Sequence, residues 1–268
     1  MTGPRALLRA AACSDIGPHR ATNQDAAFTA SWGAAVADGV GGGPAGDLAS
    51  AALIHRLAAG RLDGLEPDQL ADAVRSANWD LRAHVERDPS LSGMATTFTG
   101  LFAARDGGLL LAHTGDSRAY RLRGDELAQA SRDDSLVQAL VDRGIVSITD
   151  AASHPRRNII TASLSGAERD AATVTAYDAQ AGDRWLLCSD GLTDYVPDDE
   201  IRALLLEFPH AGTAVEACVA VALEAGCRDN VTVVVCDVLD EVEPVEMRTS
   251  TSFYGAAAER FMEGLESA

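Results

Sequence analysis

The 268-residue sequence contains no lysine, so all 22 of its basic residues are arginines. Enzymes that depend on a lysine, among them P-loop NTPases, protein kinases and Schiff-base enzymes, are therefore excluded. Positive charge is scarce altogether, because 40 acidic residues give a formal net charge of −18. A chain this acidic lacks the electrostatic footprint of a protein that binds nucleic acid or an anionic membrane. It is better suited to binding cations.

Cysteine is also sparse, and the five that occur form no C-x-x-C pair. They stand mostly in apolar stretches, which predicts reduced thiols in the core of a cytoplasmic protein. No window approaches the ~18 apolar residues of a membrane span. Near the N-terminus, Arg9 interrupts an apolar run that is already too short for a signal segment. We therefore expect a cytoplasmic chain without a membrane segment.

The apolar pattern predicts one domain of the α+β class, with a core drawn from the 47% of residues that are hydrophobic. Strands are expected at 5–13, 26–37, 96–105, 108–114, 117–123, 172–178, 184–189 and 231–238. Helices are expected at 47–59, 67–85, 135–143, 198–207 and 212–225. Strands grouped in antiparallel meanders, with helices inserted in pairs, favour a central sandwich of two antiparallel β-sheets flanked by helices over a parallel βαβ sheet.

The catalytic domain is expected to span residues 1–240, because the composition changes beyond Asp240. The remaining segment, 241–268, is first acidic, then rich in serine and threonine, and finally amphipathic. A docked or disordered C-terminal tail is the plainer interpretation, and a short partner-binding helix is the alternative. The amphipathic stretch contains Phe253, Phe261, Met262 and Leu265.

Five aspartates fall at the ends of expected strands or at turns between them: Asp25, Asp38, Asp116, Asp190 and Asp229. Strand ends can converge on one rim of a sandwich, and clustered carboxylates are stable at neutral pH mainly when cations neutralise them. Since no histidine or cysteine stands at ligand spacing, the oxygen-only set favours Mg²⁺ or Mn²⁺ over zinc. Taken singly, each Asp-Gly or Asp-Asn pair is more often an ordinary turn.

Eight motifs stand in order along the chain: SDIGPHRATNQDA, VADGVGGGPAGDLAS, GMATTFTGL, HTGDSRAYRLRGDEL, SRDDSLVQALVDRG, HPRRNIITASLSG, GDRWLLCSDGLTDYV and DNVTVVV. From about residue 12 to 238 this series resembles the type 2C, metal-dependent serine/threonine protein phosphatases, especially their small bacterial members. The resemblance implies a four-layer αββα fold. It also implies hydrolysis of phosphoserine and phosphothreonine by a water that bridges two divalent cations, Mn²⁺ or Mg²⁺, with a third ion in some members.

The resemblance also implies roles for individual residues. Asp38 matches the aspartate that bridges the two cations, and Gly39 matches the residue whose backbone carbonyl completes one cation's shell. Asp190 and Asp229 match ligands of the other cation. Arg20 matches the arginine that binds the substrate phosphate, a task that suits the planar fork of a guanidinium.

Two further assignments come from the same comparison of motifs. Asp25 matches the aspartate that positions metal-bound water, and Asp116 with Asp194 matches a weaker third-metal site. The partners implied are phosphorylated proteins, expected to be substrates of a bacterial serine/threonine kinase, with neither nucleic acid nor membrane involved.

The motifs depart from the family at two positions. Gly43 stands where bacterial members usually carry a histidine that protonates the leaving oxygen, and Gln24 replaces the usual glutamate before Asp25. General acid catalysis is worth roughly 10²–10⁴-fold, so we expect slow turnover of phosphoserine compared with a phenolic ester, unless another acid substitutes. His19 and His113 are candidates, although each is more often an ordinary surface or strand-end histidine.

Two other functions stay open. A catalytically weak phosphatase-like module could bind phosphorylated partners, and the loss at Gly43 is what favours it. A regulator phosphatase acting on an anti-sigma-antagonist protein fits less well, because such enzymes usually lack the helix-and-flap stretch present at 131–166. The active protein phosphatase is favoured by the retention of Arg20, Asp25, Asp38, Asp190 and Asp229.

Overall fold

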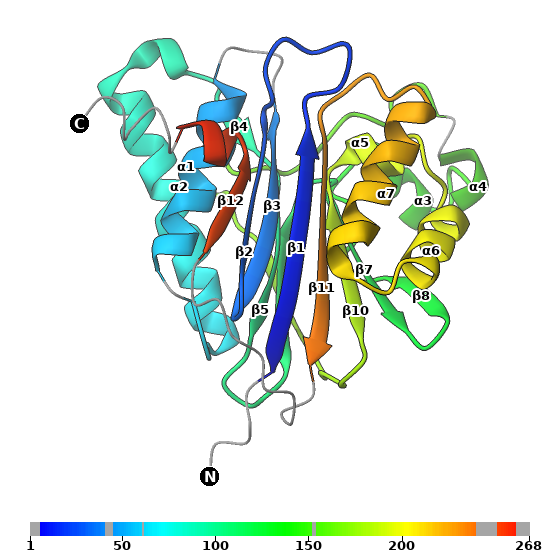
Figure 1. Cartoon of the computed structure of the whole chain (residues 1–268). Coiled ribbons are helices and arrows are strands. Elements are labelled where there is room, and N and C mark those ends of the chain that lie inside the picture. The colour runs from blue at the N-terminus through cyan, green and yellow to red at the C-terminus, as the bar shows by residue number, and fades with distance from the viewer. Residues whose placement is uncertain (1–5, 41–44, 61, 152–153, 240–250, 261–268) are drawn as a thin grey trace.

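The computed structural model describes residues 6–40, 45–60, 62–151, 154–239 and 251–260. Two antiparallel sheets pack face to face, and helices cover both outer faces (Figure 1). The predicted α+β sandwich is therefore confirmed. In the part of the chain that the structure describes, no helix is both long and apolar enough to cross a bilayer.

The first sheet has five strands, and its second strand, β11, is the most apolar. Residues 231–236 of β11 are buried, because a β-branched run suits a pleated surface that is covered on both sides. In spatial order the strands are β1 (Leu7–Asp15), β11 (Val231–Leu239), β10 (Arg184–Cys188), β7 (Arg118–Arg123) and β8 (Glu126–Gln129).

The second sheet carries the first two predicted metal-site aspartates on adjacent strands. A short strand, β4 (Ala95–Thr96), pairs with the end of β3 beside them. The other strands are, in spatial order, β12 (Ser252–Gly255), β2 (Asp25–Ala30), β3 (Gly33–Val40), β5 (Phe98–Ala103), β6 (Leu109–Thr114) and β9 (Thr173–Tyr177).

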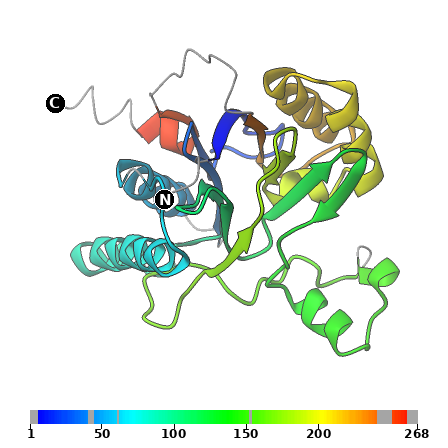
Figure 2. The same ribbon diagram turned by 90° about the horizontal axis from the view of Figure 1, so that it is seen from below.

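Three apolar cores hold the four layers together. The core between the sheets contains Trp185, Leu101 and Val234, all fully buried. Helices α1 (Gly46–Ala59) and α2 (Pro67–Arg87) cover the second sheet, and α6 (Asp198–Glu207) and α7 (Ala211–Glu224) cover the first, as seen from below in Figure 2. In α2 the residues Leu70, Val74, Ala77 and Leu81 face the core, at the spacing that predicted the helix.

The segment between β8 and β9 projects from the sandwich as a flap (Figure 2). It carries α3 (Leu136–Asp142) and the short α4 (Ile148–Ala151). Ser135 caps α3 by accepting a hydrogen bond from the backbone N–H of Gln138 at 3.1 Å. Two short helices complete the chain: η1 (Pro89–Leu91) after α2, and α5 (Asp190–Thr193) after β10.

Two strand predictions were wrong. Residues 26–37, predicted as one strand, form the hairpin of β2 and β3, in which Ala30 pairs with Gly33. The sequence is rich in alanine on both sides of the turn, so the apolar pattern did not show that the chain reverses direction there. The predicted meander ends after β6, because β7 pairs with β10 in the other sheet. The chain changes sheet at Gly115, which has a φ of +103°, and periodicity alone does not reveal a strand's partner.

The C-terminal segment returns to the sandwich. Strand β12 pairs with the edge of β2, and residues 256–260 are helical. Ala256 and Ala257 are buried in the core beneath α1. The described part of the expected tail is therefore docked on the domain, whereas Phe261, Met262 and Leu265 lie outside the described residues. All five cysteines are free thiols, and four are buried, as predicted.

Candidate metal centre

Asp25 and Asp38 lie side by side at one end of the second sheet. They are directly opposite each other in the β2–β3 ladder, so their side chains leave the same face of the sheet. The backbone of Asp38 is fixed from the other side: its N–H donates to Thr97 Oγ1 at 3.0 Å, and its carbonyl accepts from Thr96 Oγ1 at 2.9 Å. Gly39, which follows, donates its N–H to Gln24 O at 3.1 Å.

Asp190 and Asp194 occupy the two ends of the single turn α5. The N–H of Asp194 donates to the carbonyl of Asp190 at 2.8 Å, so the turn presents both carboxylates to the same region. Gly191 allows this turn to pack on the loop before β11, because a Cβ there would lie 2.0 Å from Asn230 O. That loop carries Asp229 next to Asn230.

Arg20 meets the aspartates at the mouth of the site. Its Nη2 donates to Asp229 Oδ2 at 2.5 Å. The side chain of Arg20 is 41% exposed, so the guanidinium remains accessible to a ligand. A cavity of about 210 Å³ is lined by Arg20 together with Asp38, Gly39, Asp190 and Asp229, and by seven further residues that include Gln24 and Asp116.

Burial and mutual repulsion raise the pKa values of four carboxyls, those of Asp25, Asp38, Asp116 and Asp190. Burial is the largest cause at every one, and it raises the pKa of Asp25 to about 6 although Ser189 Oγ donates to its Oδ2 at 2.7 Å. The pKa of Asp116 is raised to about 7. The pKa values of Asp38 and Asp190 are raised by burial and then by the neighbouring carboxylates. Each of these groups therefore holds its negative charge at a cost that a bound cation would remove.

The predicted metal ligands are thus brought together by the fold, and their chemistry fits hard divalent cations. All donors are oxygens, from Asp38, Asp190, Asp229 and the backbone carbonyl of Gly39, as Mg²⁺ or Mn²⁺ prefers. Within the described residues, no three acidic, histidine or cysteine side chains form a ready-made metal shell by themselves. Cations of this kind usually keep several water ligands.

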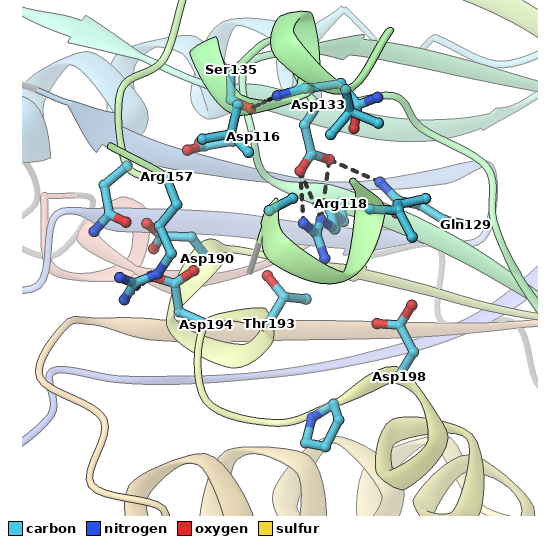
Figure 3. Close-up of a pocket in the computed structure, with 17 residues that line it drawn as sticks. Asp116, Arg118, Gln129, Asp133, Ser135, Arg157, Asp190, Thr193, Asp194 and Asp198 are labelled. Carbon is cyan, nitrogen blue, oxygen red and sulfur yellow. Dashed lines mark hydrogen bonds and ion pairs between the residues drawn. The ribbon is translucent and has the colours of Figure 1, made fainter. Parts of the chain in front are cut away.

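A second cavity, of about 410 Å³, adjoins the first and lies beneath the flap (Figure 3). Asp116, Asp190 and Asp194 lie on one side of it, beside Arg157 of the flap, whose Nη2 is 3.2 Å from Asp194 Oδ2. The predicted third-metal residues, Asp116 and Asp194, therefore line a cavity whose other walls include residues of the flap.

Comparison with known proteins gives the family. Residues 19–222, three quarters of the chain, match the family model Protein phosphatase 2C. The chain belongs to this family. The serine/threonine protein phosphatase PstP of Mycobacterium tuberculosis is 46% identical over 240 residues, which are 87% of this chain and 46% of that protein. The chain thus spans about half the length of that relative.

Two further similarities extend over most of the length of the sequence or solved domain that is compared. The serine/threonine phosphatase stp of Listeria innocua is 32% identical over 209 residues, covering 75% of this chain and 82% of that protein. The crystal structure of the catalytic domain of PstP in complex with two manganese ions superposes with a TM-score of 0.80 at 43% identity, over 88% of this chain and 100% of that one.

Of the candidate general acids of this phosphatase 2C chain, His113 is excluded by its contacts. It is 6% exposed, its Nδ1 is 2.9 Å from Thr99 Oγ1, and its Nε2 is 2.9 Å from Arg132 O. Burial also lowers the pKa of His113. The ordinary strand-end interpretation is therefore correct for this residue. His19 is exposed beside Arg20, and Gly43 lies outside the described residues.

Asn230 is a structural part of the site that the sequence reasoning missed. Its Oδ1 accepts from the N–H of Gln24 at 2.8 Å, and its Nδ2 donates to Ile16 O at 2.9 Å and Thr22 O at 3.1 Å. All three bonds reach the loop that carries Arg20. The side-chain amide of Asn230 thus ties the loop of Arg20 to the loop of Asp229. Its place directly after Asp229 in the sequence was the available signal.

Arg118 was also passed over, although it stands in the GDSR motif. Its Nε and Nη2 bind both oxygens of Asp133, at distances of 2.7–3.1 Å, and its Nη1 donates to Tyr120 Oη at 3.2 Å. Tyr120 in turn donates to Asp198 at the start of α6 at 2.9 Å. This arginine therefore joins the flap base to the first sheet.

Proposed function

We propose that this chain is a metal-dependent protein serine/threonine phosphatase that hydrolyses phosphoserine and phosphothreonine. The observation that carries the proposal is the meeting of Arg20 with Asp38, Asp190 and Asp229 around one cavity, with Asp25 beside Asp38. The two manganese ions in the structure of the related PstP catalytic domain support a two-metal centre in this chain. Mn²⁺ or Mg²⁺ is the expected cofactor, as two or three ions.

The residues of the site divide the work. Asp38, the carbonyl of Gly39, Asp190 and Asp229 would hold the cations, with Asp116 and Asp194 available for a third. When bound, the cations acidify a water and neutralise charge on the phosphoryl group. Arg20 offers a planar fork to two phosphoryl oxygens.

Asp25 is suited to orienting the attacking water. It is 1% exposed, and Ser189 fixes its orientation through Oδ2. Burial raises the pKa of Asp25 to about 6 without cations, so cations bound beside it would favour the carboxylate that accepts a hydrogen bond from the water. Arg20, Asp25 and Asp38 are therefore the proposed catalytic set.

Among the described residues, the site offers no evident general acid that could protonate the leaving oxygen, apart from His19. His113 is committed to Thr99 and Arg132, and the usual histidine is replaced at Gly43. We therefore infer that the seryl or threonyl oxygen takes its proton from water or from His19. Esters with poor leaving groups are expected to react slowly for this reason.

The shape of the site supports a phosphorylated polypeptide as substrate. The cavity beneath the flap joins the metal rim through Asp116, Asn158 and Asp190, which line both cavities. Its far wall is partly apolar, with Val137 and Ile148 among the lining residues. A volume of about 410 Å³ can receive residues that flank the phosphorylated one.

The biological setting proposed here follows from the function. Phosphorylated substrates of a bacterial serine/threonine kinase are the expected partners, and signal transduction in the cytoplasm is the expected role. The formal charge of −18 argues against binding to nucleic acid or to an anionic membrane.

The test compares p-nitrophenyl phosphate with a phosphothreonine peptide, in MnCl₂, MgCl₂ and EDTA, for the natural chain and Arg20→Ala. We expect activity that requires a divalent cation and a KM for both substrates that rises in the variant. We also expect a clear preference for the phenolic ester, because phenolate leaves without a proton donor. Folded, metal-loaded protein that turns over neither substrate would overturn the proposal in favour of a phosphatase-like binding module.

A further inference from the structure

The C-terminal segment, residues 251–260, lies against the back of the metal centre. It is outside residues 19–222, which match the family model. In Figure 1, β12 runs beside β2 and close to α1. Gly255 of β12 pairs with Ala26, the neighbour of Asp25. The next residues, Ala256 and Ala257, are 1% and 0% exposed, so the segment is anchored in the core that supports both strands of the site.

Gly255 brings this segment into contact with the backbone of Asp25. Its φ is +59°, and a Cβ on it would lie 2.3 Å from Asp25 O and 2.8 Å from Ser14 Oγ. Gly124 has nearly the same φ, +63°, but no heavy atom of the described residues lies within 4 Å of its Cβ position. Conformation alone calls for glycine at 124, whereas at 255 the close approach to Asp25 calls for it as well.

Arg260 reaches the other side of the centre. Its Nη2 forms an ion pair with Asp47 Oδ2 in the first turn of α1. Asp47 Oδ1 and Arg260 Nε are buried atoms without a hydrogen bond among the described residues, although the side chains of Asp47 and Arg260 remain 22% and 32% exposed. Gly46, the preceding residue, packs against Gly39, because a Cβ on Gly39 would lie 2.4 Å from Gly46 C and O.

A third contact holds the segment to the middle of α1. His55 Nε2 is 2.8 Å from the carbonyl of Ala257. The ring of Phe253 meets the imidazole of His55 edge-on, with 4.8 Å between the centroids. The segment therefore touches α1 in its first turn and again at His55, and its strand β12 pairs alongside β2 as far as Ala26.

We propose that residues 251–260 form a clamp that fixes the metal-binding ends of β2 and β3. Gly255 is a positioning residue for Asp25. Arg260 is a positioning residue for the carbonyl of Gly39, acting through Asp47 and Gly46. The inference rests on the proposed function for the role of the cations, and its test therefore measures cation affinity directly in the full chain.

The first comparison is Arg260→Ala with Arg56→Ala, by calorimetric titration with Mn²⁺ and by thermal unfolding. Arg56 is the control, because it pairs with Asp80 at 2.8 Å from the last turn of the same helix, far from Gly39. Arg260→Ala is expected to weaken Mn²⁺ binding about tenfold, which equals ~1.4 kcal/mol. Arg56→Ala should leave the Kd unchanged, and Arg260→Lys should recover part of the loss. Saturating Mn²⁺ should restore kcat.

An unchanged Kd in Arg260→Ala, or an equal loss in Arg56→Ala, would overturn the clamp while leaving the phosphatase proposal intact. A natural chain that does not bind Mn²⁺ would overturn the phosphatase proposal itself. The two failures are therefore distinguishable.

The second comparison is Gly255→Ala with Gly124→Ala. Both substitutions force an L side chain into the same left-handed conformation, so both should lower the melting temperature. Only Gly255→Ala should also weaken Mn²⁺ binding, because only its Cβ displaces Asp25. Equal melting temperatures with an unchanged Kd in both variants would contradict the clamp. If Gly255→Ala does not fold, the Arg260 comparison decides.

Discussion

Two pairs of aspartates at the site, which we call the strand half (Asp25 and Asp38) and the flap half (Asp116 and Asp194) of the acidic rim, are built differently. Asp25 and Asp38 stand on paired strands, and the backbone of Asp38 is fixed by Thr96 and Thr97. Asp116 and Asp194 stand on a turn and at the end of a single helical turn, facing the flap and its Arg157. Asp25 and Asp38 are thus held by the sheet, whereas Asp194 forms an ion pair with a residue of the flap.

This difference predicts that the strand half performs the chemistry. Cations that activate water require ligands held in a fixed geometry. Adjacent strands supply it for Asp38, and Asp190 and Asp229 complete the proposed set from α5 and the loop before β11. A carboxylate that pairs with a flap arginine can exchange that partner for a cation or a substrate group. We therefore expect the strand half to be indispensable for turnover, and the flap half to adjust it.

The largest effect should separate the halves directly. Asp38→Asn removes a carboxylate that would hold the proposed cations, so kcat/KM should fall by about 10³-fold or more. Asp194→Asn should change it by no more than about tenfold, because this carboxylate already shares its charge with Arg157. Steady-state kinetics at saturating MnCl₂ measures both. Comparable losses in the two variants would show that the halves are equally essential.

The next effect concerns the connection between the Arg20 loop and Asp229. Asn230→Ala removes three hydrogen bonds to the loop of Ile16, Thr22 and Gln24. Losing buried partners of this kind costs about 1–3 kcal/mol of stability, which urea unfolding would detect. The KM for a phosphopeptide should rise about tenfold, since Arg20 is no longer positioned. Asn78→Ala is the control, because this equally buried side chain also binds the backbone of a loop, at Gly166 and Ala167, but does not line the cavity of Arg20. An unchanged KM in Asn230→Ala would mean that Arg20 is held by other contacts.

Much of this arrangement was predictable from sequence. The positions of the aspartates followed from strand ends and turn pairs, and the regular spacing of Leu70, Val74 and Leu81 gave α2 within two residues of its observed end. Such signals are local, because each arises within a single element. The resemblance of the motifs to a known family then predicted how these elements are arranged in the fold.

What escaped prediction depends on distant partners. Strand β12 pairs with β2, more than 220 residues earlier, and nothing in SFYG specifies that edge. Ser189 and Asn230 are small polar residues whose roles appear only when their partners, Asp25 and the loop of Arg20, come into contact. The partner of β7 was missed for the same reason, since hydrophobic alternation indicates a strand but not its neighbour.

The smallest effect is a pH dependence of stability that both halves of the rim should share. The pKa values of Asp25 and Asp116 are raised to about 6 and about 7. Unfolded chains have released these protons by about pH 5, whereas the folded protein still holds them, so stability should fall as pH rises from 5 to 8. In EDTA the melting temperature should therefore decrease over this range, by several degrees for a loss of a few kcal/mol.

Cations should reverse this trend, because they stabilise the ionised carboxylates in the folded state. Excess Mn²⁺ is expected to raise the melting temperature most at pH 8. Asp116→Asn should flatten the EDTA profile in part, whereas Asp106→Asn, in an exposed turn, should leave its slope unchanged. A melting temperature that rises with pH in EDTA would show that these carboxylates are not destabilised by burial. It would then remove the electrostatic argument for cation binding at both halves of the rim.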